Sequence, residues 1–457
     1  MIFSLDRHAS AKALYDSALR RWLSYSELRE LVCEWRDAVE SPSKTVAFNF
    51  CRNDVRSIAM YLGCLDSGVA IALLDDGLAA EAKAGLIDLY QPDFVSSGEE
   101  VPASGYEYVT ESLWRRIKPA EPAPHPDLAL LLSTSGSTGS PRFVRLTRRN
   151  VESNADSISQ VLNIGTADCA ITSLPIHYSY GLSVLNTHLL RGASLALTGQ
   201  GLMEPGFWET FRAAECTSFA GVPYLYQILK RLNPDRLNVP SLNTMTQAGG
   251  RMDAELIGKF SAWIAGRGGR FFVMYGQTEA TARISILPAE DLPAKIGSVG
   301  KPIPGGHVEI GEGDAGGELV YHGPNVMMGY AANRDDLARG DELHGRLITG
   351  DHARLDEDGY LYITGRAKRD AKVFGLRINL DEVENMLRIH GPVAVISRGE
   401  QLCVYLEQGD DETFAKHRSD LAERLRIHHS AFTFLRIEKL PVTSSGKIDY
   451  PKLTGLP

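Results

Sequence analysis

The chain has 457 residues and a formal net charge of −9, and its 44% hydrophobic and 23% charged residues are the composition of an ordinary globular protein. The net negative charge disfavours binding to the phosphate backbone of nucleic acids, because proteins that bind nucleic acids usually present a basic face. The length exceeds what one hydrophobic core supports, so at least two domains are expected.

The cysteines and the apolar segments exclude several further classes. None of the six cysteines lies within three residues of another, so their spacing indicates neither a metal knuckle nor a redox pair. Reduced, buried thiols in a cytoplasmic protein are therefore expected. Asp6 and Arg7 stand where a signal peptide needs apolar residues. The most apolar window, 58–74, contains Asp66 and two glycines, which favours a buried helix and strand over a membrane span.

In chain order, the N-terminal part predicts alternating helices and strands. Residues 24–39 place apolar side chains at helical spacing behind Ser24, a favourable N-cap. The next segments predict a strand at 45–50, a helix at 57–68 and a strand at 69–75. This rhythm implies a parallel α/β layer. Similar alternation continues through 169–176, 193–199, 218–232 and 270–276.

The C-terminal third has a different pattern. After about Ile296 the chain is rich in glycine and short β-prone runs, which predicts strands and tight turns. A polar stretch at 367–370 is suited to a linker, and a helix is expected after Asn379 or Asp381. The predicted fold is therefore α/β. It has a large N-terminal domain of α/β layers over 1–366, with a β-rich subdomain at about 296–366, and a small α+β C-terminal domain over 371–457.

The most informative segment follows an apolar strand at 128–132. Six of the eight residues 133–140 carry hydroxyl groups and the other two are glycines. Such a loop can turn backbone N–H groups and hydroxyls toward an anion, and Arg142 adds a positive fork for phosphate oxygens. No Gly-Lys-Ser/Thr sequence ends the loop, so it is not a Walker loop. Taken alone, a flexible surface loop is the alternative interpretation.

This loop resembles the Ser/Thr/Gly-rich phosphate loop of the acyl-adenylate-forming superfamily, which includes acyl- and aryl-CoA synthetases, peptide-synthetase adenylation domains and luciferases. The resemblance implies ATP and Mg²⁺ as cofactors. It assigns phosphate binding to Thr134, Ser135, Gly136, Ser137, Thr138, Gly139 and Arg142. The superfamily usually has lysine at the position of Arg142 and glycine at that of Phe143. These two departures bear on pyrophosphate handling and on the mobility of the loop.

The segment MYGQTEA at 274–280 resembles the superfamily's Tyr-Gly-x-Thr-Glu motif. The resemblance implies that adenine stacks on Tyr275 next to Gly276 and that Thr278 contacts the α-phosphate. It also makes Glu279 the Mg²⁺ ligand, since a hard carboxylate suits that ion. Without a ligand, the segment would be a strand-to-loop turn. Upstream, three small residues resemble the segment that lies against the adenine, although a tight turn explains them equally well: Ala248, Gly249 and Gly250.

Further residues of the superfamily's pattern occur toward the C-terminus. By resemblance, Asp351 accepts hydrogen bonds from the ribose hydroxyls, and Arg366 makes a second ribose or phosphate contact and is counted as catalytic. Lys447, on a glycine-containing loop, would stabilise charge that develops on the carboxylate and the α-phosphate during adenylation. Residues 356–359 are assigned only a β-hairpin turn.

The resemblance also implies that the small C-terminal domain is mobile, with one pose for making the adenylate and another for delivering the thiol. Lys368 falls at the hinge position, although a solvated lysine in a charged linker is an equally good interpretation. Gly375, in a Lys-x-x-Gly-x-x-Ile segment, would let the backbone pass close to the pantetheine arm of the acceptor.

Residues 173–184 resemble the segment that forms the acyl pocket and its gate. The pocket is assigned to His177, Tyr178, Gly181, Gly221 and Tyr224. Alternatively, His177 is a packed wall that takes no proton. Members that activate amino acids usually carry an Asp near here, and none occurs between 173 and 187, which disfavours an α-amino acid. Such a pocket suits a modest, mostly apolar carboxylic acid.

Together these features predict an acid–thiol ligase of a biosynthetic pathway. ATP would activate a small carboxylic acid as acyl-AMP with release of pyrophosphate. The acyl group would pass to coenzyme A or to the phosphopantetheine of an acyl or peptidyl carrier protein acting in trans. No nucleic-acid or membrane partner is expected, and the sequence does not indicate an oligomeric state. The alternatives are a stand-alone amino-acid adenylation protein, a catalytically impaired nucleotide-binding homologue and a light-emitting oxygenase.

Overall fold

The computed structural model describes residues 2–98, 104–110, 112–133, 142–312, 316–366, 369–373, 376–399, 401–425, 427–443 and 447–456. The chain forms two compact units, and each has its own hydrophobic core. The first comprises Met1–His307 and His322–Leu347, and the second comprises Val308–Tyr321 and Ile348–Pro457. The predicted α/β class is confirmed. The predicted hinge stays a prediction, since residues 367 and 368 lie outside the described residues.

The first helix and the strands after it form where local signals predict them. Helix α1 (Tyr25–Ala38) begins after Ser24, whose hydroxyl accepts a hydrogen bond from the N–H of Glu27. The Glu27 carboxylate in turn accepts the N–H of Ser24, so each residue satisfies a backbone donor of the helix terminus. There follow β3 (Val46–Cys51), α2 (Val55–Ser67) and β4 (Ala70–Asp75). Strands β3 and β4 pair in parallel, which confirms the predicted strand–helix–strand rhythm.

An eight-stranded sheet in the first unit holds the two strands that flank the hydroxyl-rich loop. Its order is β19-β9-β8-β4-β3-β5-β7-β6. Besides β3 and β4, its strands are β5 (Phe94–Ser96), β6 (Tyr106–Thr110), β7 (Leu113–Arg116), β8 (Leu128–Ser133), β9 (Phe143–Thr147) and β19 (Gly329–Ala331). Strand β8 runs parallel to β4 and antiparallel to β9. The loop therefore leaves and re-enters the sheet on neighbouring strands.

A nine-stranded sheet in the same unit has the order β16-β15-β14-β13-β12-β10-β11-β1-β2. Its strands are β1 (Lys12–Asp16), β2 (Arg21–Ser24), β10 (Cys169–Ile171), β11 (Ser194–Leu197), β12 (Ser218–Gly221), β13 (Thr244–Gln247), β14 (Arg270–Tyr275), β15 (Ser285–Leu287) and β16 (Lys301–Pro302). Strands β10 to β14 pair in parallel. The turns after β12, β13 and β14 therefore meet at one edge, where open α/β sheets bind ligands.

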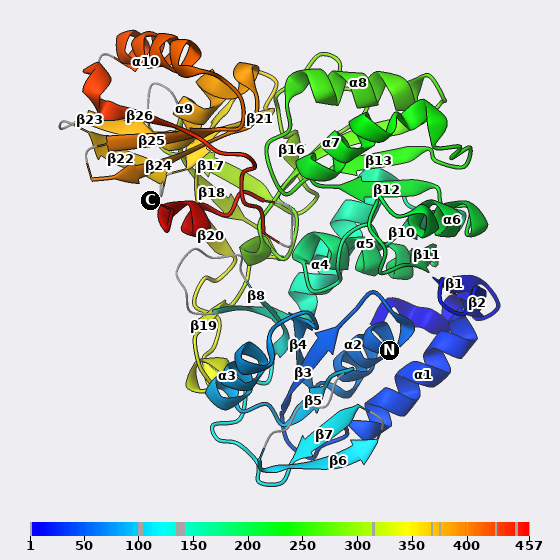
Figure 1. Cartoon of the computed structure of the whole chain (residues 1–457). Helices are drawn as coiled ribbons and strands as arrows, with labels where there is room; N and C mark the ends of the chain where they lie inside the picture. Colours follow the sequence, from blue (N-terminus) through cyan, green and yellow to red (C-terminus); the bar gives the residue numbers. More distant parts are fainter. Residues whose placement is uncertain are drawn as a thin grey trace. The chain divides into compact units, whose positions relative to one another are not determined.

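Four helices fill the space between these two sheets. Helices α1, α2, α4 (Arg148–Leu162) and α5 (Ser179–Leu190) contribute apolar residues to one cluster that includes strands of both sheets. Helices α4 and α5 pack side by side in this layer (Figure 1). The unit also contains α3 (Ala80–Tyr90), α6 (Pro205–Ala213), α7 (Pro223–Leu232) and α8 (Ala254–Ala265). Short 3-10 segments occur at Ile2–His8, Pro234–Arg236, Thr278–Ala280 and Asp335–Ala338.

The second unit is built on three smaller sheets. Strands β17 (His307–Ile310), β18 (Gly317–His322), β20 (Arg346–Leu355) and β21 (Leu361–Arg366) form a sheet that lies mainly in this unit. Strand β22 (Asp370–Val373) pairs with β23 (Leu376–Asn379), and β24 (Val393–Arg398), β25 (Gln401–Leu406) and β26 (Phe432–Arg436) form the third sheet. The α-helices of the second unit are α9 (Leu380–Leu387), α10 (Asp411–Leu425) and α11 (Tyr450–Thr454). The unit also has 3-10 segments at Arg388–His390 and His429–Ala431.

Two expectations from the sequence about residues 297–366 are met. The described residues of 297–366 contain no α-helix, as the glycine-rich pattern predicts. The β20–β21 connection is the predicted turn: the N–H of Asp356 donates to the carbonyl of Tyr360 at 3.0 Å, and Gly359 has a φ of 80°. Throughout the described parts of the chain, no helix is long and apolar enough to cross a membrane.

Candidate active site

The flanks of the hydroxyl-rich loop show how the chain anchors it. Residues 134–141, which include six of the predicted phosphate ligands, lie outside the described residues. Ser133 and Phe143 are partners in the antiparallel β8–β9 register. The Phe143 side chain is fully buried, with its ring centroid 4.6 Å from that of Tyr90 and 5.8 Å from that of Phe48. The residue that replaces the superfamily's usual glycine therefore fixes the start of β9 in the core.

The predicted phosphate-binding arginine stacks on a tyrosine of β19. The guanidinium carbon of Arg142 lies 4.8 Å from the ring centroid of Tyr330, a cation–π contact. The Tyr330 hydroxyl donates a 2.7 Å hydrogen bond to Oε1 of Glu279. Burial, together with the negative charge of Glu279, raises the pKa of Tyr330, so the hydroxyl keeps its proton as a donor. One tyrosine thus connects the arginine at the loop exit to the predicted metal ligand.

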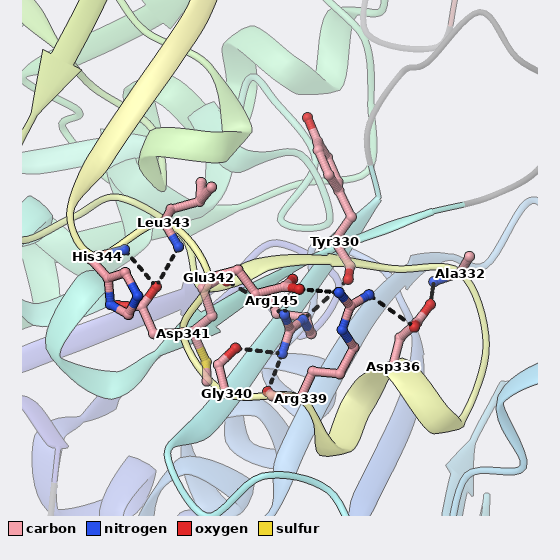
Figure 2. A network of polar contacts seen from close by, with 11 residues as sticks. Arg145, Tyr330, Ala332, Asp336, Arg339, Gly340, Asp341, Glu342, Leu343 and His344 are labelled. Carbon is pink, nitrogen blue, oxygen red and sulfur yellow. Dashed lines mark hydrogen bonds and ion pairs between the residues drawn. The ribbon is translucent and has the colours of Figure 1, made fainter.

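A buried arginine holds β19, and with it Tyr330, against β9 (Figure 2). Arg145 is 0% exposed, and its Nη2 lies 2.7 Å from Oε2 of Glu342. Its Nε donates to the carbonyl oxygen of Tyr330 at 3.2 Å, and its Nη1 donates to the carbonyl oxygens of Arg339 and Gly340. Burial lowers the pKa of Arg145, and the Glu342 carboxylate opposes that shift. The network satisfies backbone acceptors in β19 and in the segment that follows it, and so fixes the strand that carries Tyr330.

Thr278 and Glu279 lie in a short turn after β14 that other segments hold in place. The Thr278 hydroxyl oxygen is 3.2 Å from that of Ser179 at the start of α5. The N–H of Met327 donates to the carbonyl oxygen of Glu279 at 2.9 Å. A Cβ on Gly276 would lie 2.0 Å from a backbone carbonyl oxygen, so this position of the turn requires glycine. The turn is therefore fixed by α5 on one side and by the segment before β19 on the other.

The small residues after β13 lie against the start of α5. Ala248 is buried, and Gly249 has a φ of 82°. A Cβ on Gly249 would lie 2.6 Å from the hydroxyl oxygen of Tyr178, closer than real Cβ contacts. The predicted adenine-stacking residue, Tyr275, ends the adjacent strand β14. Contact between protein groups thus accounts for Gly249, as the tight-turn interpretation expects, and adenine contact stays a prediction.

The predicted acyl-pocket residues cluster around the start of α5. The Nε2 atom of His177 lies 4.0 Å from Oδ2 of Asp75, and its buried Nδ1 has no hydrogen-bond partner among the described residues. Burial lowers the pKa of His177 and the Asp75 charge opposes this, so the ring is neutral near pH 7. Gly181 and Gly221 allow close packing, because an added Cβ would lie 2.2 Å from a carbonyl oxygen and 2.8 Å from a tyrosine ring, respectively. Tyr224 joins the same hydrophobic cluster as Tyr178.

In the second unit, two predicted nucleotide contacts are cross-strand neighbours. Asp351 on β20 lies directly opposite Arg366 on β21 in the antiparallel register. Asp351 is buried, and its N–H donates to Oγ1 of Thr349 at 3.1 Å. Residues opposite each other in such a pair lie close together. The sheet therefore brings together two residues that lie 15 positions apart in the sequence, from 351 to 366.

Lys447 lies in a loop near the C-terminus that closes on itself. Its carbonyl oxygen accepts the N–H of Thr443 at 2.7 Å, and its own N–H donates to Oγ1 of Thr443 at 3.3 Å. The approach of Lys447 to a nucleotide stays a prediction. Lys368 and Gly375 lie outside the described residues, so their hinge and thiol-path roles also stay predictions.

Two residues that contact the predicted site carry no motif signal in the sequence. Tyr330 follows Glu279 by 51 residues, and Ser179 precedes Thr278 by 99 residues. Each contact arises from tertiary packing, through the pairing of β19 with β9 and the position of α5.

The Glu279 carboxylate fits a magnesium ion. One of its oxygens accepts the Tyr330 hydroxyl, and no lysine or arginine among the described residues forms an ion pair with it. Mg²⁺ prefers hard oxygen ligands and is usually bound through one or two carboxylates together with substrate phosphates. A carboxylate fixed by a neutral hydroxyl donor, next to the Thr278 hydroxyl, suits that role.

Comparison with known proteins identifies the family. The family model described as AMP-binding enzyme matches residues 4–331. The chain belongs to the AMP-binding enzyme family. It is 31% identical to an oxalate–CoA ligase of Arabidopsis thaliana over 347 residues, 71% of this chain and 66% of the relative. It is 29% identical to tyrocidine synthase 1 of Brevibacillus parabrevis over 356 residues, 72% of this chain and 32% of that relative.

This AMP-binding family member thus spans about two thirds of the length of the first of these relatives and about one third of the second. Its fold is that of a solved o-succinylbenzoate CoA synthetase from Bacillus subtilis in complex with its acyl-adenylate intermediate. The TM-score is 0.78 at 21% sequence identity, covering 100% of this chain and 99% of that chain. The family and the fold class that the motifs predict are confirmed.

Proposed function

We propose that this protein activates a carboxylic acid with ATP and passes the acyl group to a thiol. The observation that carries the proposal is the Arg142–Tyr330–Glu279 array at the exit of the hydroxyl-rich loop. In this array the Arg142 guanidinium stacks on the Tyr330 ring and the Glu279 carboxylate accepts the Tyr330 hydroxyl, next to the turn with Thr278. These are the groups needed to hold a magnesium-bound triphosphate. Membership of the AMP-binding family supports the adenylation step.

In the first step, a carboxylate oxygen of the acid attacks the α-phosphorus of ATP. The bond from that phosphorus to the oxygen bridging the β-phosphate breaks, and pyrophosphate leaves. Glu279 would hold Mg²⁺, which neutralises negative charge on the phosphates. Arg142 and the hydroxyl-rich loop would hold the departing phosphates, and Thr278 the α-phosphate. Positioning and preorganised charge supply most of the catalysis.

In the second step, a thiol gives up its proton and its sulfur attacks the acyl carbonyl carbon, so that the bond to AMP breaks and a thioester forms. Asp351 and Arg366 would hold the ribose, and Lys447 would act only in the first step. Rotation about a hinge at 367–370 would then bring Gly375 to the path of the thiol arm. The relative named as an oxalate–CoA ligase supports coenzyme A as acceptor, and tyrocidine synthase 1 is the reason to test a carrier protein.

The decisive experiment is ATP–pyrophosphate exchange with a library of carboxylic acids that includes α-amino acids. Mass detection of thioester on coenzyme A and on a phosphopantetheine-bearing carrier protein follows. We expect exchange with a restricted set of non-amino acids and thioester on coenzyme A. Exchange confined to α-amino acids would favour an amino-acid adenylation protein. Binding of ATP without exchange for any acid would replace the proposal with a nucleotide-binding homologue that does not catalyse.

A matched pair of variants tests the role of the central carboxylate. Glu279→Gln keeps the size of the side chain and removes its charge, so magnesium-dependent exchange should fall by about 10²–10³-fold, as when one preorganised catalytic group is lost. Glu290→Gln makes the same chemical change at an exposed position 11 residues further along the chain and should leave exchange unchanged. Equal activity of both variants would remove Glu279 from the mechanism.

A further inference from the structure

A cavity lies inside the first unit, between helices α4 and α5 and the face of the nine-stranded sheet formed by β12, β13 and β14. Its volume is about 40 Å³. One water molecule needs about 10–15 Å³, so the cavity has room for a few waters or for a small polar group of a ligand. Apolar side chains such as Ile158, Val184 and Met274 form part of the wall, and several polar side chains form the rest.

Arg283 contributes a buried positive charge to this wall. The residue is 3% exposed. Its Nη1 donates to the carbonyl oxygen of Ala282 at 2.9 Å, its Nε points to Sδ of Met274 at 3.3 Å, and its Nη2 approaches Oγ of Ser183 at 3.4 Å. The guanidinium carbon lies 4.1 Å from the ring centroid of Tyr180. A guanidinium has five N–H donors, and none of these partners carries a negative charge.

The other buried arginines of the described chain have carboxylate partners. Arg145 pairs with Glu342 at 2.7 Å, and Arg334 pairs with Asp93 at 3.2 Å. No described acidic residue forms an ion pair with Arg283. A buried charge without a counter-ion is costly, because the protein interior replaces little of the hydration that the charge loses. Among the described residues, Arg283 therefore lacks the counter-ion that the other two buried arginines have.

Two other polar groups of the cavity wall do not supply a counter-ion to Arg283. The carboxylate of Asp168 is already used, since it accepts the N–H of Gly165 at 2.8 Å and the hydroxyl of Thr217 at 3.2 Å. The Nδ1 of His188 lies 2.8 Å from the carbonyl oxygen of Val184, so Nδ1 carries the proton and Nε2 is an acceptor. That Nε2 is buried and has no hydrogen-bond partner among the described residues.

The predicted acyl pocket lies next to the cavity, because Tyr178 and Tyr224 of the pocket belong to the same hydrophobic cluster as Tyr180 and Met274 of the cavity wall. Tyr180, in the cavity wall, follows Ser179, whose hydroxyl contacts Thr278. Met274, also in the wall, precedes Tyr275. None of the five predicted acyl-pocket residues lines the cavity, so an acid whose reacting carboxylate lies near Thr278 would reach the cavity past Tyr180 and Met274.

We propose that the acid activated by this protein carries a second anionic group, a carboxylate or a sulfonate, and that Arg283 binds this group in the cavity. The inference rests on the proposed function and names the substrate class for the same site. A guanidinium fork matches the two oxygens of such a group bidentately, and the stack on Tyr180 keeps the fork oriented. The anion would supply the negative charge next to Arg283 that no described side chain supplies.

The test is ATP–pyrophosphate exchange with matched pairs of acids: succinate and succinamate, glutarate and glutaramate, and 3-sulfopropionate with pentanoate. The wild type should favour each dianion over its singly charged partner by about 30-fold or more in kcat/KM, the effect of truncating one partner of a buried charge pair. Arg283→Met should abolish this preference and leave the singly charged acids within about threefold of the wild type. Arg270→Met removes a charge elsewhere in the same wall and should keep the preference for dianions.

A second variant keeps the test possible if Arg283→Met does not fold. Ser183→Asp places a carboxylate beside Nη2 of Arg283, so it supplies an internal counter-ion and should abolish the preference without removing the arginine. If the wild type uses dianions and singly charged acids equally, or if both folded variants keep the preference, the inference is overturned while adenylation stands.

If no acid supports exchange, the proposed function fails, and thermal unfolding with the same acid pairs then decides on binding alone. Stabilisation by a dianion that is lost in Arg283→Met supports the anion site. Absence of stabilisation in the wild type, or its persistence in that variant, overturns the site.

Discussion

Replacing Tyr330 with phenylalanine should weaken the use of Mg²⁺ and ATP without unfolding the protein. The change removes the hydroxyl 2.7 Å from Oε1 of Glu279 and keeps the ring on which Arg142 stacks at 4.8 Å. A hydrogen bond to a charged group contributes about 1.5–3 kcal/mol. Losing a partner that orients a metal ligand costs about 10–100-fold in activity, which is about 1.4–2.7 kcal/mol. The two magnitudes agree, so kcat/KM for ATP should fall by about 10–100-fold.

The assay is pyrophosphate exchange at a fixed acid concentration with Mg²⁺ titrated. Tyr330→Phe should raise the Mg²⁺ concentration at half-maximal rate. The control is Tyr362→Phe, which removes a hydroxyl 3.3 Å from Oδ2 of Asp356 in the hairpin turn and should leave exchange within about twofold. A folded Tyr330→Phe protein with unchanged Mg²⁺ dependence would refute the reasoning, because the hydroxyl would then not orient a metal ligand.

Four further substitutions test other parts of the structure. Arg145→Met should lower the free energy of unfolding of the first unit by about 1–3 kcal/mol or more, because Glu342 and several backbone carbonyls lose their donor, as thermal unfolding would detect. Gly276→Ala should lower the free energy of unfolding by about 1–3 kcal/mol, because the added Cβ would lie 2.0 Å from a carbonyl oxygen. Gly258→Ala, in α8 with open space around it, should instead stabilise by about 0.5–1 kcal/mol. Lys447→Ala should lose adenylation yet retain thioester formation from supplied acyl-AMP, and equal loss of both steps would contradict its role.

Elements whose own residues decide their structure could be predicted from the sequence. The capping pair of Ser24 and Glu27 lies three residues apart, and its hydrogen bonds form within one helical turn. The turn at 356–359 likewise closes through hydrogen bonds between near neighbours. In both cases the donor and the acceptor are local, so composition and spacing contain the information.

The partners of the motif residues could not be predicted. The motif at 274–280 marks Thr278 and Glu279, but it contains nothing that indicates Ser179 or Tyr330. These contacts join segments separated by 99 and 51 residues, and they exist because helices and strands pack in one particular arrangement. Periodicity describes which face of an element is buried, and it does not name the element that covers that face.

The sequence by itself determined the α/β class, the family and the order of the motifs, because hydroxyl-rich, glycine-rich and apolar runs have local physical meaning. Only the tertiary structure decided that Arg142 and Glu279 share Tyr330, and that Arg283 is buried beside a cavity without a carboxylate partner. The reason is that burial and counter-ion pairing depend on which distant residues are brought together. The same arginine on the surface would be an ordinary solvated charge.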